Sequence, residues 1–149
     1  MGVHCLDTLR FVLDDEVVSV KGETEPKPTN KRTETSAQLV LRFSHGTIGS
    51  IFVSYDSPIR QSSIEILGTD AKVSAVDFTV GNRRSELKIE KRSETNSPHV
   101  VIEEFEVPNL YVDEVNAFST SILHNTEPPL DGGNALMNQK VLDAMLTLS

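Results

Sequence analysis

Hydrophobic residues recur at helical spacing at both ends of the chain. Five of them in residues 4–13 fall on one side of a helix: Cys5, Leu6, Leu9, Val12 and Leu13. The same period returns in residues 109–125, where the stripe is Val112, Val115, Phe118 and Ile122. It returns again in residues 134–149, where the stripe is Leu136, Met137, Val141, Met145 and Leu148. The pattern predicts one helix at the start and two at the end, the last capped by Asp131 or Asn134.

Between these segments the period changes to two, which is typical of strands. In residues 35–44, Ala37, Leu39, Leu41 and Phe43 alternate with polar residues, and Val40 is the exception. A turn centred on Gly46 leads into a partner strand at 47–55, which indicates a hairpin. Further strands are expected at 16–25, 62–69, 71–80, 85–92 and 99–107, with an exposed loop at 26–33.

The order of these elements predicts the fold class. Strands that follow one another through short turns form antiparallel sheets, and helices at the chain ends then cover one sheet face. We therefore expect an α+β fold with one mostly antiparallel, open-faced sheet of about six strands and helices on one face. The other face mixes Val40 and Phe52 with Gln38, Arg42 and Ser54, which suits a partly apolar partner surface.

Length and charge narrow the functional classes. A chain of 149 residues fits one domain with a sizeable core. The net charge of −8 argues against nucleic acid and anionic membranes as partners, because both require a basic footprint. No stretch approaches the roughly 20 apolar residues of a membrane span. Cys5 is the only cysteine, so no intrachain disulfide can form, and we expect a cytoplasmic protein.

Motifs of standard active sites are mostly absent from the sequence. There is no G-x-G-x-x-G, P-loop, C-x-x-C, H-E-x-x-H or G-x-S-x-G. His4, Cys5 and Asp7 are too compressed for a good three-ligand metal site, so no metal is expected. His45, His99 and His124 have structural interpretations in a turn, a strand start and a helix end. His4, at the entrance of the first helix, is the remaining catalytic candidate.

The first helix carries a family resemblance. Residues 2–13, "GVHCLDTLRFVL", resemble the second half of the motif G-G-x-x-x-D-x-G-x-H-x-x-D of the Gfo/Idh/MocA family of NAD(P)-dependent oxidoreductases, with Gly2, Val3, His4 and Asp7 in the matching places. The hairpins at 41–55 and 64–73 and the closing helices at 111–146 are similar to later parts of the same family.

The resemblance implies a fold, an organisation and an activity. The fold would be that of a glyceraldehyde-3-phosphate dehydrogenase-like C-terminal domain. Residues 1–149 would be a C-terminal substrate and oligomerisation domain, with the N-terminal Rossmann domain absent from this chain. The parent would transfer a hydride between NAD or NADP and a sugar, polyol or related carbinol. The fragment alone is expected to bind no cofactor, and a homo-oligomer is expected through the open sheet face.

The resemblance also assigns roles to residues. His4 would act as general acid/base on the substrate hydroxyl, since the ordinary pKa of a histidine lies close to neutral pH and suits proton transfer. Tyr111 and Arg60 would contact the small-molecule substrate. Simpler alternatives remain for each: His4 only caps or packs its helix, and Tyr111 and Arg60 are surface side chains. The whole chain also has an alternative, a non-enzymatic oligomerisation or binding domain on a free-standing sheet.

Overall fold

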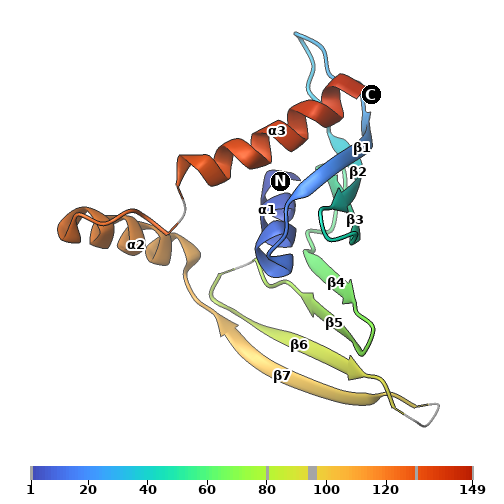
Figure 1. Cartoon of the computed structure of the whole chain (residues 1–149), viewed down its shortest axis with the longest axis vertical. Coiled ribbons are helices and arrows are strands. Elements are labelled where there is room, and N and C mark those ends of the chain that lie inside the picture. The colour runs from blue at the N-terminus through green and yellow to red at the C-terminus, as the bar shows by residue number, and fades with distance from the viewer. Residues whose placement is uncertain (1, 80, 94–96, 130, 149) are drawn as a thin grey trace. The chain divides into compact units, whose positions relative to one another are not determined.

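In the part of the chain that the structure describes, the three helical and seven alternating segments of the sequence become three helices and seven strands. The computed structural model describes residues 2–79, 81–93, 97–129 and 131–148. In chain order (Figure 1) the elements are α1 (Gly2–Leu13), β1 (Val17–Glu25), β2 (Ser36–Phe43), β3 (Ile48–Ser54), β4 (Ser63–Leu67), β5 (Ala71–Val76), β6 (Arg83–Lys91), β7 (His99–Val107), α2 (Leu110–His124) and α3 (Gly132–Leu148).

The chain divides into two compact units. The first unit contains Met1–Pro58 and Leu130–Ser149, and the second contains Ile59–Pro129. The first unit has a three-stranded antiparallel sheet in the order β1-β2-β3, and the second has a four-stranded antiparallel sheet in the order β4-β5-β6-β7. Within each sheet, every strand thus pairs with its neighbours along the chain, as the hairpin signals predict.

In the first unit, α1 and α3 cover one face of the three-stranded sheet. α1 packs against β3, α3 packs against β1, and the two helices contact each other (Figure 1). The core is the cluster of Leu6, Val20, Leu39, Leu41, Phe43, Ile51, Val141 and Met145. On β2 the buried residues alternate with exposed Gln38, Val40 and Arg42, so the period-two pattern predicts the buried face correctly.

Glycine permits the close approach of α3 to β1. A Cβ atom added at Gly22 would lie 2.6 Å from the backbone oxygen of Gln38 and 2.9 Å from Cγ of Met145. Both distances are far inside ordinary van der Waals contact, so a side chain here would push helix and strand apart. The missing side chain lets Met145 fill the space above the strand.

In the second unit, the two faces of the four-stranded sheet differ in chemistry. One face carries buried or half-buried apolar residues: Ile64, Ile66, Val73, Ala75, Leu87 and Ile89. The opposite face carries ion pairs of Lys72 with Glu65 and Glu90, and of Lys88 with Glu90. The alternation of apolar and charged residues along each strand separates these two faces.

Helix α2 follows the four-stranded sheet and has defined ends. The side-chain oxygen of Asn109 accepts a hydrogen bond from the backbone N–H of Val112 at 3.3 Å, which caps the start. Asn125 ends the helix in a left-handed conformation with φ of 51°. The sequence predicts a stripe of Val112, Val115, Phe118 and Ile122, and in the structure all four side chains are exposed.

The predicted α+β class with antiparallel, open-faced sheets is confirmed. The arrangement of the strands differs from the prediction. About six strands were expected in one sheet, whereas the seven strands form one sheet of three and one of four. Residues 55–62 separate β3 from β4 and include Pro58, which has no backbone N–H to extend a ladder. A strand pattern alone does not reveal that the hydrogen-bond ladder stops between two neighbouring strands.

Candidate functional site

His4 lies on the exposed side of α1, in the first unit. Its backbone oxygen accepts a hydrogen bond from Oγ1 of Thr8 at 2.8 Å, and its own side chain is exposed. Phe11, seven residues further on and thus on the same side of the helix, is 82% exposed. Leu6, on the opposite side, is fully buried in the core. The core therefore holds α1 so that His4 faces outwards.

Asp7, one turn after His4, is bound to α3. Its Oδ1 accepts hydrogen bonds from Nδ2 of Asn138 at 2.7 Å and from Nδ2 of Asn134 at 2.9 Å. Burial pushes the pKa of the Asp7 carboxyl upwards, but these hydrogen bonds and the charges of Arg10 and His4 outweigh burial and lower the pKa below its ordinary value. Asp7 is therefore a carboxylate at neutral pH, one helical turn from the candidate catalytic histidine.

Arg10 connects the same two helices to the start of β1. Its Nε and Nη2 donate to the two carboxylate oxygens of Glu16 at 2.8 and 2.7 Å. Its Nη1 donates to Oδ1 of Asn138 at 2.8 Å and to Oδ1 of Asn134 at 2.9 Å. The guanidinium is buried, and each of its three nitrogens donates to a carboxylate or amide oxygen. We call Asp7, Arg10, Glu16, Asn134 and Asn138 the α1–α3 clasp.

A second carboxylate anchors the turn between β2 and β3. Asp15 accepts hydrogen bonds from the hydroxyl of Ser44 and from the backbone N–H groups of His45 and Glu16. The Ser44 hydrogen bond, opposed by burial and aided by the His45 and Glu16 N–H groups, lowers the pKa of Asp15 to about 2. Gly46, with φ of 95°, completes the turn in a conformation that favours glycine. This cluster is structural, and His45 belongs to it.

Tyr111 and Arg60 both belong to the second unit. Tyr111 lies in the first turn of α2 with 81% of its side chain exposed, and Arg60 lies in the exposed segment between β3 and β4. Both side chains are accessible to a ligand. The same exposure is also typical of ordinary surface residues. Because His4 belongs to the first unit, the assembly of all three into one site stays a prediction.

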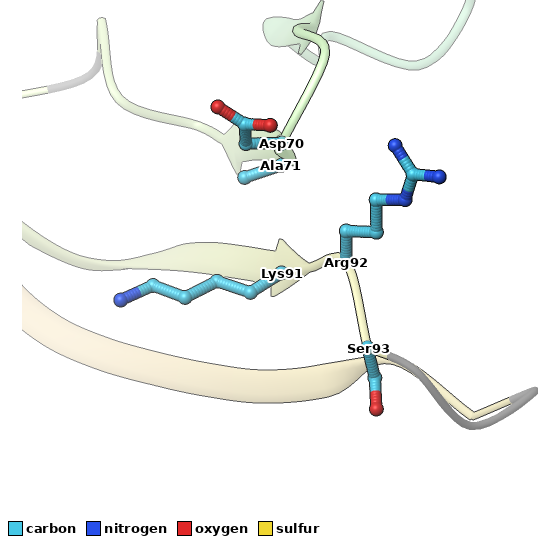
Figure 2. Close-up of a pocket in the computed structure, with 5 residues that line it drawn as sticks. All are labelled: Asp70, Ala71, Lys91, Arg92 and Ser93. Atoms are coloured by element: carbon cyan, nitrogen blue, oxygen red, sulfur yellow. The ribbon is translucent and has the colours of Figure 1, made fainter.

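A shallow hollow lies where the β4–β5 turn meets the end of β6. Figure 2 shows its lining residues: Asp70, Ala71, Lys91, Arg92 and Ser93. The backbone N–H of Arg92 donates to the backbone oxygen of Asp70 at 2.7 Å. The side chains of Lys91 and Arg92 extend in different directions (Figure 2), so they do not converge on one anion. None of the three predicted site residues lines this hollow.

The described residues contain neither a grouped set of metal ligands nor a membrane-spanning helix. Within residues 2–79, 81–93, 97–129 and 131–148, no three His, Cys, Asp or Glu side chains are grouped to hold a metal ion. In the same part of the chain, no helix has the length and apolar character needed to cross a membrane.

Comparison with known proteins identifies the family. Residues 1–74, about half of the chain, match the profile of the GFO/IDH/MocA C-terminal domain. This match includes α1 with His4 and Asp7 and continues into β5. The chain belongs to the GFO/IDH/MocA family. The resemblance inferred from the residues around His4 is thereby confirmed.

Solved structures share this fold along almost the whole chain. A Desulfitobacterium hafniense protein assigned as an NADPH-dependent oxidoreductase has a TM-score of 0.83 at 24% identity, over 99% of this chain and 44% of its own. Aldose-aldose oxidoreductase from Caulobacter crescentus has a TM-score of 0.79 at 17% identity, over 99% of this chain and 43% of its own. The WlbA dehydrogenase from Bordetella pertussis, in complex with NADH and UDP-GlcNAcA, has a TM-score of 0.67 at 23% identity, over 99% of this chain and 40% of its own. The chain thus spans less than half the length of these proteins.

The α1–α3 clasp was not predicted from the sequence. Two signals for it are present: a D-x-x-R spacing in residues 7–10, and two asparagines four residues apart at 134 and 138. Each spacing puts two polar groups on one helix face, where they need partners if the face is buried. A search for capping and catalytic motifs overlooks them, because neither pattern is a catalytic motif by itself.

Proposed function

We propose that this chain is the C-terminal, substrate-side domain of a two-domain oxidoreductase. The full-length enzyme transfers a hydride between NAD or NADP and a sugar, polyol or related carbinol. Its Rossmann domain is a separate domain outside this chain. The observation that carries the proposal is the family match over residues 1–74, which contains His4 on the exposed side of a well-anchored helix.

The starts of helices α2 and α3 do not suit the phosphates of a nicotinamide cofactor. A dinucleotide phosphate needs an open helix N-terminus behind a glycine-rich turn. The N-terminus of α2 is occupied by the Asn109 side chain, and that of α3 by Asp131, whose Oδ1 accepts from the N–H of Asn134 at 2.9 Å. A carboxylate at the start of α3 would also repel a phosphate. We therefore assign cofactor binding to the other domain.

His4 supplies the acid/base chemistry of the proposed reaction. When the carbinol carbon is oxidised, its hydroxyl must lose a proton, and the His4 imidazole accepts it. In the reverse direction the imidazolium returns that proton to the carbonyl oxygen. Imidazole suits this exchange because its ordinary pKa lies near neutral pH. The exposed position of His4 leaves its ring nitrogens accessible to a substrate.

Tyr111 and Arg60 are proposed substrate contacts. Both carry hydrogen-bond donors that suit the hydroxyl groups of a sugar, and both are exposed. Substituting either residue is expected to raise the KM for the sugar more than it lowers kcat. Equal KM values for the wild type and for Tyr111→Phe and Arg60→Gln would leave the two as surface residues.

Self-association through the outer face of the three-stranded sheet is part of the proposal. This face exposes Val40, Ile48 and Phe52 opposite the helix-covered side. Exposed apolar patches of this kind commonly mark interfaces. Phe52→Asp is expected to shift the sedimentation profile towards monomer, whereas Gln139→Asp, on the exposed side of α3 and away from this face, is not. We also propose a cytoplasmic location, since a single free cysteine suits a reducing compartment.

Substitution of His4 in the full-length enzyme tests the catalytic role. His4→Ala is expected to lower kcat by about 10²–10⁴-fold, the usual contribution of a positioned acid or base, with the cofactor dissociation constant unchanged. His4→Gln is expected to be equally slow, because glutamine can hydrogen-bond but cannot exchange a proton. A kcat for His4→Gln within a few-fold of wild type would make His4 a structural residue and the proposed catalytic role wrong.

A further inference from the structure

Helix α1 is held in place on two sides, and neither side includes His4. On the apolar side, Leu6 is fully buried in the core, with Cys5, Leu9 and Leu13 packed against it. On the polar side, Asp7 and Arg10 are bound to α3 by the α1–α3 clasp. Apolar packing alone tolerates small slides and rotations of a helix, because dispersion contacts are non-directional. Directional hydrogen bonds on the polar side restrict them.

The two asparagines of α3 act as oriented connectors. Each places its amide oxygen against Nη1 of Arg10 and its amide nitrogen against Oδ1 of Asp7. A reversed amide would bring NH₂ against the guanidinium and oxygen against the carboxylate, so charge determines the orientation. Asp7 and Arg10 are one turn apart on α1, and Asn134 and Asn138 are one turn apart on α3. Four groups linked in this way hold the two helices in one register.

Asn138 is the most buried connector. It is 3% exposed, whereas Asn134 is half-buried. Water can replace a lost hydrogen bond at a half-exposed group but not at a buried one. The restraint on α1 therefore depends more strongly on Asn138 than on Asn134.

We propose that Asn138 is a positioning residue for His4. Its amide joins Asp7 to Arg10, holds α1 in one register against α3, and so holds His4, one turn before Asp7, at a fixed place and angle. The inference depends on the proposed function, since only an acid/base role makes the angle of His4 matter. Proton transfer requires heavy atoms about 2.6–3.2 Å apart. A displacement of about 1 Å can lower the rate up to about 10²-fold.

The test compares two amide-to-acid substitutions on neighbouring residues of α3 in the full-length enzyme. Asn138→Asp keeps the size and the acceptor for Arg10, but replaces the donor facing Asp7 with a repelling carboxylate. Gln139→Glu makes the same change where Nε2 of Gln139 donates to Asp143 at 2.8 Å on the exposed side of α3. Asn138→Asp is expected to lower kcat by about 10–100-fold with an unchanged cofactor dissociation constant, while Gln139→Glu retains wild-type kcat.

A double substitution separates positioning from general damage. Asp7→Asn combined with Asn138→Asp exchanges the carboxylate and the amide, so the donor–acceptor pair between these two residues and the net charge are both restored. Asn134 Nδ2, which shares the Oδ1 acceptor of Asp7, loses it in this variant, but Asn134 is half-buried and water can replace that bond. The exchanged enzyme is expected to recover kcat to within a few-fold of wild type, together with its Tm. Recovery of Tm without recovery of kcat would overturn the proposal, because the clasp would then support the fold and not the catalytic surface.

Further controls keep the two proposals distinct. If Asn138→Asp does not fold, Asn138→Ser removes both hydrogen bonds without adding charge, and about a 10-fold loss of kcat is expected at temperatures well below its Tm. Wild-type kcat in folded Asn138→Asp or Asn138→Ser, beside a slow His4→Ala, would overturn only the positioning role. Wild-type kcat in His4→Ala would overturn the acid/base role of His4, and the lack of NAD- or NADP-dependent turnover of sugars and polyols by the full-length protein would overturn the proposed function itself.

Discussion

The two units of this chain use the same kind of antiparallel hairpins but stabilise them differently. In the first unit, eight buried hydrophobic residues from two helices and three strands form one cluster. Among the described residues of the second unit, the buried hydrophobics are Ala75 and Val107. Helix–sheet burial therefore stabilises the first unit, whereas hydrogen-bond ladders between neighbouring strands contribute more to the second.

The units also differ in how they place charge. The first unit buries Arg10 and gives it oriented acceptors on α3 and Glu16. The second unit keeps its ion pairs on an open sheet face, as with Arg84, whose side chain is 75% exposed beside Glu104 and Glu106. Buried charges need complete partners, whereas exposed ones are solvated by water. Interactions that fix geometry are therefore concentrated in the unit that carries His4.

The largest difference in stability between the two units is expected when an apolar side chain is truncated to alanine. Leu41→Ala removes a side chain that is 1% exposed at the centre of the first unit's core. Its loss should lower the free energy of unfolding by about 2–5 kcal/mol, through lost burial and a residual cavity. Leu87→Ala, at a half-buried position of the four-stranded sheet, should lower the free energy of unfolding by less. Urea unfolding of both variants measures this, and equal losses would remove the contrast between the two units.

A smaller difference in stability is expected between substitutions of two arginines, Arg10 in the first unit and Arg84 in the second. Arg10→Met keeps most of the packing but leaves the acceptors of Glu16, Asn134 and Asn138 without their donor. This should lower the free energy of unfolding by about 1–3 kcal/mol, the usual cost of an unsatisfied buried polar group, because Asn138 is 3% exposed. Arg84→Met should change the Tm little, because exposed ion pairs contribute little. A large loss for Arg84→Met would show that the charged sheet face stabilises the second unit after all.

The smallest expected effect is a change in pH dependence. The pKa of Asp15 is lowered to about 2 in the folded chain, below its ordinary value of 3.8. Its carboxylate therefore contributes stability that is present above about pH 4 and is lost as the pH falls towards 2. Asp15→Asn should remove this contribution, so that Tm falls less steeply between pH 4 and 2 than in the wild type. Thermal melts at several pH values measure this. An equal fall of Tm with pH in the two proteins would exclude Asp15 as a source of acid sensitivity.

The sequence alone determined the elements and the buried face of the best-patterned strand. Period-two alternation in 35–44 predicted the burial of Leu39, Leu41 and Phe43, and helical spacing predicted all three helices. These features depend on residues a few positions apart, so a local pattern records them. The residues around His4 likewise indicated the family, because a family motif is also local in sequence.

Only the tertiary structure decided which distant groups meet. Arg10 and Asn138 are 128 residues apart, yet they share a buried hydrogen bond of 2.8 Å. The division into sheets of three and four strands and the exposure of the α2 stripe were also invisible in the sequence. Hydrophobic periodicity tells which side of an element is apolar, but not which element covers it. That choice depends on packing and polar pairing between segments far apart in the chain, which no local pattern encodes.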